Sequence, residues 1–276
     1  MLTACGAARM GYQNGEFVSY WWLNSYIDIE SDQSPMVKKH LASLFEWHHK
    51  TQLKDYAQFL ADQQRRLQRI VTKSDLLADN VDIRRRLQLL ADRALPELAE
   101  LALSLRPQQI SHLEKKFASN NDTYRKENLR GDLEMRQRFR FKKALQQAEY
   151  WFGNFSREQE AKIRIASDAR PMNNELMMAD RLQRQRELIA LLRKIQAQKP
   201  ARDATIAILK EYSNNSFFER PGLRPELKAF LEASKDGTAQ MESVIINLAT
   251  PEQKAHAIKK AQQWIDDFNL LANTAG

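Results

Sequence analysis

Apolar residues recur along most of the chain at the spacing of an amphipathic helix. Between residues 54 and 71 the apolar side chains follow the i, i+3, i+4 rule, whereas Lys54, Arg65 and Arg66 fall on the opposite face. The same period returns between residues 87 and 101. No segment alternates apolar and polar residues for long enough to indicate a strand. The pattern therefore predicts an all-α fold, an elongated bundle of roughly seven to nine helices without a significant β-sheet.

Helix-start and loop signals divide this pattern into segments. Ser34 and Pro35 predict the start of a long helix, with Ser34 as its N-cap, and residues 72–75 mark the next boundary. Pro96 and Pro171 should kink or break the helices that contain them. Residues 213–224 are the strongest loop signal. Further helices are predicted over residues 107–129, 132–152, 157–198, 201–212, 225–248 and 251–271.

The N-terminal segment has a different character. We interpret residues 1–14 as the remnant of a lipid-attachment signal with a tether, and residues 15–276 as a single helical domain with possible sub-divisions near residues 153–156 and 213–224. Residues 17–27 concentrate aromatic side chains, among them Trp21 and Trp22. We favour a short amphipathic helix packed on the domain. The alternative is a segment that places Trp and Tyr at the level of lipid headgroups.

The first residues, Leu2-Thr3-Ala4-Cys5-Gly6, match the bacterial lipobox, in which the cysteine receives lipid before the signal peptidase cuts ahead of it. The alternative is a free cysteine near a frayed terminus. Because Gly6 follows Cys5 where an aspartate would favour the inner membrane, we expect the outer membrane. A working signal also needs a basic and an apolar segment ahead of the lipobox, and only Met1 precedes it. We therefore expect a translation start further upstream or a trimmed chain.

The charge balance bears on possible partners. The chain of 276 residues contains 43 Lys and Arg against 35 Asp and Glu, and this net charge of +8 suits nucleic acid, anionic lipid or an acidic client protein. Arg136, Arg140 and Lys143 stand on one side of a predicted helix and are basic candidates for a binding surface. Because acidic residues are interspersed with the basic groups, we favour solvated helix faces and expect no nucleic-acid binding.

Motifs for catalysis and cofactor binding are missing from the sequence. It contains no G-x-S-x-G turn, no G-x-G-x-x-G and no phosphate-binding loop. Glu46 and His49 have the spacing of a di-iron helix, but the second such pair that a di-iron site needs is missing. We therefore expect no metal, no cofactor and no enzymatic activity. His48 and His49, beside Trp47, are predicted to lie at the edge of the core, and Trp47 and His48 are further candidates for a binding surface.

Three helix starts look alike, at residues 105–109, 155–159 and 249–253. The last two are capping boxes, in which Ser156 or Thr250 caps the helix and the glutamine three residues later reaches back to the N-cap amide. These starts are similar to the Leu-Thr-x-x-Gln signature of the CpxP and Spy type periplasmic chaperones. The resemblance implies a chaperone-like role. Because the spacing of the three starts is uneven, it does not predict a solenoid.

A broader resemblance covers almost the whole chain and rests on short motifs in a fixed order. These motifs are Tyr20-Trp21-Trp22-Leu23, Tyr26-Ile27-Asp28, Trp47-His48-His49, Tyr56-Ala57, Leu95-Pro96-Glu97-Leu98, Gln109-Ile110, His112-Leu113-Glu114, Tyr124-Arg125 and Trp151-Phe152-Gly153. In order and spacing they resemble an uncharacterised family of proteobacterial lipoproteins with a domain of unknown function. The resemblance implies a location in the cell envelope and no particular mechanism.

The sequence thus leads to one expectation about function and two alternatives. We expect a periplasmic protein, anchored in the outer membrane through lipid on Cys5, that binds envelope proteins or anionic envelope components without catalysis. The alternatives are a cytoplasmic basic protein that binds nucleic acid and an unrecognised envelope hydrolase. A steep loss of affinity with salt would favour the first alternative, and a deep polar pocket with strongly shifted acids would favour the second.

Overall fold

The computed structural model describes residues 11, 12 and 14–274, and within these residues the protein is built from helices without a strand. The described residues form eleven α-helices and one π-helix. Their bounds are α2 Gly15–Ile27, α3 Ser34–Thr51, α4 Leu53–Arg66, α5 Lys73–Ser104, α6 Pro107–Asn128, α7 Leu133–Phe152, α8 Arg157–Asp168, α9 Asn174–Gln198, α10 Arg202–Ser213, η2 Asn214–Phe218, α11 Pro225–Leu248 and α12 Pro251–Thr274. None of the described helices is both long and apolar enough to cross a bilayer.

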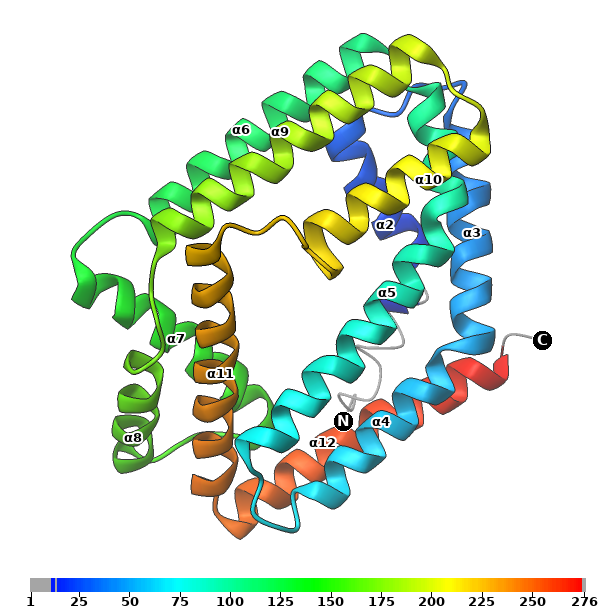
Figure 1. Cartoon of the computed structure of the whole chain (residues 1–276). Helices are drawn as coiled ribbons and strands as arrows, with labels where there is room; N and C mark the ends of the chain where they lie inside the picture. The colour runs from blue at the N-terminus through cyan, green and yellow to red at the C-terminus, as the bar shows by residue number, and fades with distance from the viewer. Residues whose placement is uncertain (1–10, 13, 275–276) are drawn as a thin grey trace.

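The helices pack mainly as pairs of segments that lie far apart in the sequence (Figure 1). Helices α6 and α9 run side by side along one edge of the molecule, and α4 and α12 run together along the opposite edge. Helices α7, α8 and α11 close the left side of this view, while α5 contacts α9, α10 and α11. Helix α2 lies against α3 and α6. The arrangement is therefore a frame of paired helices.

Two main clusters of buried side chains form the core. The first gathers residues of α2, α3, α5, α6, α9 and α10, including Ile110 and Ile195, which are 2% and 1% exposed. The second gathers residues of α7, α8, α11 and α12 around Ile163, which is fully buried. A small third cluster contains Val71, Leu76 and Ala239. Each cluster joins helices from distant parts of the chain, so the helices depend on one another for burial.

The all-α prediction is confirmed, but the predicted number of roughly seven to nine helices is too small. One cause is Gln52, where the long helix predicted from Ser34 divides into α3 and α4. The bend buries Leu53 completely and directs α4 along α12. Ser34 is the first helical residue, and Gln33 occupies the N-cap position. Because the bend follows from a contact with the far end of the chain, the local apolar period does not reveal it.

The two predicted proline effects have different outcomes. At Pro171 the chain leaves helical structure, since α8 ends at Asp168 and α9 begins at Asn174. Helix α5, in contrast, runs from Lys73 to Ser104 with Pro96 inside it. The neighbours Leu95 and Ala99 are 5% and 0% exposed. We infer that their packing outweighs the backbone hydrogen bond that Pro96 removes.

The segment 213–224, predicted as a loop, is partly helical. Residues 214–218 form the π-helix η2, with an N–H···O bond of 2.8 Å from Glu219 back to Asn214. Helix α5 holds this turn, because Arg84 donates to the Phe218 carbonyl at 2.7 Å and Gln88 donates to the Asn214 side chain at 3.1 Å. The turn residues of this segment predict a loop correctly only for residues 219–224. The π-turn depends on polar side chains from a helix more than a hundred residues away.

One hydrogen-bond arrangement recurs at three helix starts and in the turn that leads into α3. In each, the side-chain oxygen of a glutamine accepts a hydrogen bond of 2.9–3.0 Å from a backbone N–H three residues earlier. Three of these starts are the ones that look alike in the sequence, and the fourth precedes α3. The four pairs of capped residue and glutamine are Glu30 with Gln33, Arg106 with Gln109, Ser156 with Gln159 and Thr250 with Gln253.

The glutamines of the first two starts bind each other across the first core. Gln109 donates to the Gln33 side-chain oxygen at 2.7 Å, and Gln33 lies 3.1 Å from the Gln109 oxygen in return. Gln33 also donates to the Ser104 carbonyl at 3.0 Å, and Gln109 to the Asp28 carbonyl at 2.9 Å. Both glutamines are buried, at 4% and 2% exposure. The pair therefore joins two helix starts through side chains whose amides are fully hydrogen-bonded.

The glutamines of the other two starts repeat this arrangement beside the second core. Gln159 and Gln253 bind each other at 2.8 and 3.2 Å. Gln159 donates to the Leu248 carbonyl at 2.8 Å, and Gln253 donates to the Asn154 carbonyl at 2.7 Å. As in the first pair, each accepting carbonyl lies two residues before the partner's capped residue. Two equivalent glutamine pairs thus join helix starts, Gln33 with Gln109 at the first core and Gln159 with Gln253 at the second.

Candidate binding groove

Two adjoining cavities lie beside the second core, among helices α4, α5, α7, α11 and α12. Their volumes are about 690 and 320 Å³, and they share the lining residues Leu76, Trp151, Phe152, Glu242 and Ile246. We call them together the apolar groove. The remaining lining residues are Lys143, Ala144, Gln146, Gln147, Ala148, Tyr150, Met241 and Ile245 in the first cavity, and Phe59, Leu60, Gln63, Gln64, Arg66, Leu67, Val71, Asp79, Asn80, Ile83, Ala257 and Ala261 in the second.

The aromatic wall of the groove comes from the last turn of α7. Gly153 follows this turn with φ 76°, a backbone conformation that glycine adopts without strain, and ends the helix there. Because of this sharp exit, Phe152 and Phe155 both reach the second core, with ring centroids 6.3 Å apart. Tyr150 stays 44% exposed at the mouth, where its hydroxyl accepts from the Trp264 indole at 2.9 Å. The wall is therefore fixed by packing and by a hydrogen bond.

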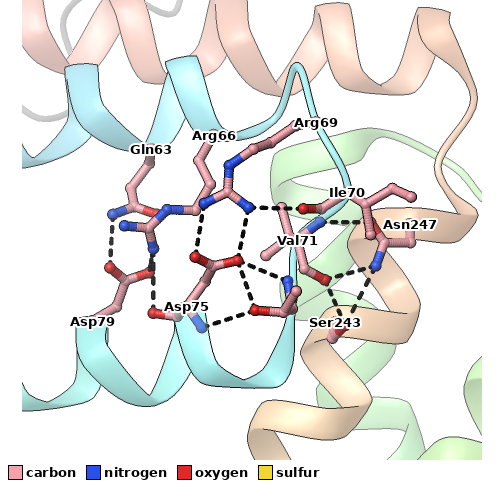
Figure 2. Close-up of polar contacts among 10 residues, drawn as sticks. Gln63, Arg66, Arg69, Ile70, Val71, Asp75, Asp79, Ser243 and Asn247 are labelled. Carbon is pink, nitrogen blue, oxygen red and sulfur yellow. Dashed lines mark hydrogen bonds and ion pairs between the residues drawn. The ribbon is translucent and has the colours of Figure 1, made fainter.

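A polar cluster at the turn between α4 and α5 supports the other side of the groove (Figure 2). Thr72 and Asp75 form a capping box at the start of α5. Arg69 donates two hydrogen bonds to Asp75, at 2.9 and 2.7 Å, and these bonds lower the pKa of Asp75 well below its usual range. Arg66 donates to Asp79 at 2.5 Å, and Gln63 donates to the same carboxylate at 3.1 Å. Asp75 and Asp79 are thus each bound to a neighbouring arginine.

The same turn is tied to α11 through the backbone of Val71 (Figure 2). The Asn247 side chain accepts from the Val71 N–H at 3.0 Å and donates to the Val71 carbonyl at 2.8 Å. Ser243 donates to that carbonyl as well, at 2.7 Å. Val71 is only 2% exposed, so these side chains satisfy a backbone that water does not reach. The two sides of the groove are therefore held at a fixed separation.

Glu242 is the one acidic side chain common to both cavities. Burial raises its pKa, the charge of Arg170 opposes that rise, and the Asp79 carboxylate adds to it. Asp79 is already bound by Arg66 and Gln63, and no histidine, cysteine or serine is among the residues that line the groove. Between these polar side chains, the aromatic and aliphatic lining residues offer a surface that can bind an apolar group.

A larger cavity of about 1070 Å³ lies between α9, α10, η2 and α11. Its wall mixes charges of both signs, and its central carboxylate, Asp180, is ion-paired with Arg184 at 3.1 Å and with Arg220. The Asp180 side chain is only 5% exposed. The charges around Asp180 therefore mainly stabilise one another.

The structure brings Arg136, Arg140 and Lys143 together around a small cavity of about 220 Å³. Arg140 is not solvated as predicted: it donates to three carbonyls at 2.8–3.1 Å at the end of α8, and burial lowers its pKa to about 10. Arg136 forms an ion pair with Glu175 at 2.6 Å. The predicted solvated basic face is therefore wrong for Arg136 and Arg140, because both join α7 to the chain around α8 and α9.

His48 lies in an aromatic cluster that ties Tyr12 to the start of α4. Its two ring nitrogens lie 2.6 Å from the Tyr12 hydroxyl and 3.2 Å from the Tyr56 hydroxyl. His49 stacks on Tyr12 with ring centroids 4.6 Å apart, and Trp47 receives the guanidinium of Arg93 at 5.8 Å. Burial lowers the pKa of His48 to about 4. Trp47 and His48 thus pack at the edge of the domain, and Tyr12, expected in the tether, contacts it.

The lowered pKa of His48 predicts a loss of stability in acid. The folded protein holds a neutral imidazole down to about pH 4, whereas the unfolded chain binds a proton near the ordinary value of 6.5. Stability is therefore full above pH 6.5 and should fall as the pH drops to 4. Because His48 is partly exposed, we expect a loss of about 1–2 kcal/mol. Urea unfolding at pH 7.5 and 4.5 measures it. An unchanged pH dependence in His48→Gln would contradict this origin.

The remaining candidates lie outside the groove. Trp21 and Trp22 are 65% and 56% exposed on α2, and Cys5 lies outside the described residues. Within the described residues no group of three or more His, Cys, Asp or Glu side chains is placed to hold a metal ion. Sequence reasoning missed the groove itself and the pairing of the glutamines. The repeated glutamines at the helix starts are visible in the sequence. Which glutamine binds which is not.

Comparisons with known proteins give one match. No curated protein matches the chain, and no solved structure does. A family described as a family of unknown function, DUF6279, matches residues 25–211. These residues run from α2 to α10 and leave out α11 and α12, which supply one side of the groove. Since the match covers more than half of the sequence, the chain belongs to the DUF6279 family of unknown function.

Proposed function

We propose that this protein is a non-catalytic lipoprotein of the bacterial envelope that holds apolar segments of other envelope proteins in the apolar groove. The observation that carries the proposal is the groove lining, which combines Met241 with the aromatic residues Tyr150, Trp151 and Phe152. Methionine adapts to varied apolar shapes, and aromatic side chains provide large contact areas at low entropic cost. Such a lining suits a client that is recognised by its apolar character and not by one sequence.

The charges around the groove fit the same role. Lys143 is among its lining residues, and Lys260 sits 4.5 Å from the centroid of the Tyr150 ring, so two cations lie beside the groove. Inside, the charges of Asp79 and Arg66 are paired with each other. A client segment could therefore place its apolar side chains in the groove and pair its acidic side chains with these lysines. The resemblance of the helix starts to those of periplasmic chaperones supports a chaperone-like version of this role.

Client binding is tested by suppression of aggregation of an unfolded envelope protein. Tyr150→Ser removes an aromatic side chain from the mouth of the groove, and we expect about a five-fold loss of suppression per mole of protein, from the lost contact area. Leu133→Ser is the matched control, since Leu133 is 61% exposed at the other end of the same helix. An equal loss in both variants, or suppression unchanged by Tyr150→Ser, would contradict a role for the groove.

Attachment to the envelope is tested separately, by labelling with a radioactive fatty acid and by membrane fractionation of the protein expressed from its own locus. We propose that Cys5 carries the lipid and that the protein faces the periplasm from the outer membrane. Label and outer-membrane recovery should both be lost in Cys5→Ala. A wild-type protein without label would remove the lipid anchor from the proposal and leave the groove as a property of a protein in another compartment.

A further inference from the structure

Helix α2 presents an apolar face that no described part of the chain covers. The side chains of Phe17, Val18, Trp21 and Trp22 are 72%, 53%, 65% and 56% exposed. At 100° per residue these four positions fall within an arc of about 140°, so they form one continuous face. Four large apolar side chains side by side exceed the scattered apolar residues of an ordinary protein surface. The face is therefore a candidate contact surface.

The opposite face of α2 fixes the helix on the domain. Tyr20, Leu23, Tyr26 and Ile27 pack against the first core. The Tyr20 hydroxyl donates to Ser34 on α3 at 2.9 Å. On the other flank, the Tyr26 hydroxyl accepts from Asn120 of α6, also at 2.9 Å. The exposed tryptophans thus belong to a helix that is bound on both sides, and their exposure is not the result of a loose end.

Lysines lie along both flanks of this helix. Lys38 of α3 sits 5.2 Å from the centroid of the Tyr20 ring, and Lys116 of α6 sits 5.4 Å from that of Tyr26. Their neighbours Lys39 and Lys115 are exposed. None of the four lysines forms an ion pair with another residue in the part of the chain that the structure describes. The exposed face of α2 is thus apolar and aromatic, and these lysines lie on both of its sides. This combination suits the surface of an anionic bilayer, where apolar side chains enter the headgroup boundary and lysines meet lipid phosphates.

We propose that the exposed face of α2 docks on an anionic phospholipid bilayer, with Trp21 and Trp22 at the headgroup boundary and the flanking lysines against lipid phosphates. The position in the sequence supports this partner. Cys5 precedes Gly15 by ten residues, which can span at most about 35 Å. A lipid on Cys5 and the α2 face could therefore engage one membrane, giving the second signal that stable anchoring needs. A symmetric contact between two copies is disfavoured, because it would bring like-charged flanks together.

The inference rests on the proposed lipoprotein role for its place in the cell, but it can be tested without the lipid. Cys5→Ser protein is mixed with vesicles of phosphatidylcholine and phosphatidylglycerol in equal parts, and bound protein is measured by sedimentation. We expect binding that weakens with salt, and a loss of about 10-fold or more in Trp21→Ser/Trp22→Ser. Leu133→Ser/Ile165→Ser, which changes residues 61% and 71% exposed elsewhere, should bind like the parent. Circular dichroism verifies that each variant is folded.

The outcomes separate the possibilities. Failure of the Cys5→Ser protein to bind anionic vesicles would overturn the inference, even if the lipid label on Cys5 is found. Equal losses in both double variants would also overturn it. A dimer in light scattering that disappears in Trp21→Ser/Trp22→Ser would assign the face to a second copy instead of lipid. Vesicle binding by the parent with no lipid label in the cell would retain this inference and reject the lipid anchor.

Discussion

Gln109→Ala should lower the free energy of unfolding by about 3 kcal/mol, or the melting temperature by roughly 10 °C. Gln109 is 2% exposed and uses its whole amide. It accepts from the Arg106 N–H and donates to Asp28 and Gln33. Removal leaves these groups without the partner that Gln109 provides, and an unpaired group beside the buried Gln33 costs more than the lost bond itself. Urea unfolding followed by circular dichroism measures the change.

The second glutamine pair provides an internal comparison. Gln253 makes the same set of bonds as Gln109 but is only partly buried, so water can replace part of what is lost. We expect Gln253→Ala to cost about 1 kcal/mol. The exposed neighbour Gln108 is the control, and Gln108→Ala should change stability by less than about 0.5 kcal/mol. Similar small losses at Gln109 and Gln108 would show that the buried pair does not hold the helix starts together.

Asp79→Ala should lower the free energy of unfolding by about 2–4 kcal/mol. Asp79 is 8% exposed and accepts from Arg66 at 2.5 Å and Gln63 at 3.1 Å. Without it, a guanidinium whose side chain is 21% exposed loses its carboxylate. The change also removes a negative charge that raises the pKa of Glu242, so that pKa should fall. Urea unfolding gives the first effect, and a titration of the glutamate carboxyl by nuclear magnetic resonance gives the second.

Asp62 is the matched control for this change. It forms an ion pair with Arg65 on the same helix α4, but the two side chains are 45% and 67% exposed. Exposed pairs contribute little, so Asp62→Ala should cost less than about 1 kcal/mol and leave the Glu242 pKa unchanged. If both aspartates prove equally dispensable, the polar cluster of Figure 2 does not hold the turn between α4 and α5. The groove would then lack the support on which the proposed client binding depends.

The sequence by itself determined which segments are helical. The start signals at residues 72–75 and at Ser156 each act within three or four residues, and the structure has Thr72 and Ser156 as side-chain caps. The amphipathic period and the low content of Gly and Pro required helices almost throughout. Such signals can be read locally, because a cap or a turn of helix is completed by residues that are close together in the chain.

Where the sequence failed, a contact between distant segments made the decision. The division at Gln52 follows the packing of α4 on α12, and η2 depends on Arg84 and Gln88 of α5. Of the kink or break predicted at Pro96, the break does not occur, since α5 continues through this residue and its neighbours Leu95 and Ala99 are buried. In each case a local propensity worth a few kcal/mol at most competes with burial of several side chains. Local propensity alone therefore cannot predict which conformation the segment adopts.

The candidate surfaces show the same division. The sequence identified Trp21 and Trp22 as residues that needed a partner, but only the packing of Tyr20 and Tyr26 on the domain decided which face of α2 is left exposed. It marked the glutamines at three helix starts, but only the fold brought them together in pairs. The groove was not visible at all, because its walls come from five helices of different parts of the chain. Helix caps and the helical period can be predicted from the sequence because they involve residues close together in the chain. Contacts between distant side chains depend instead on how the helices pack their apolar faces against one another.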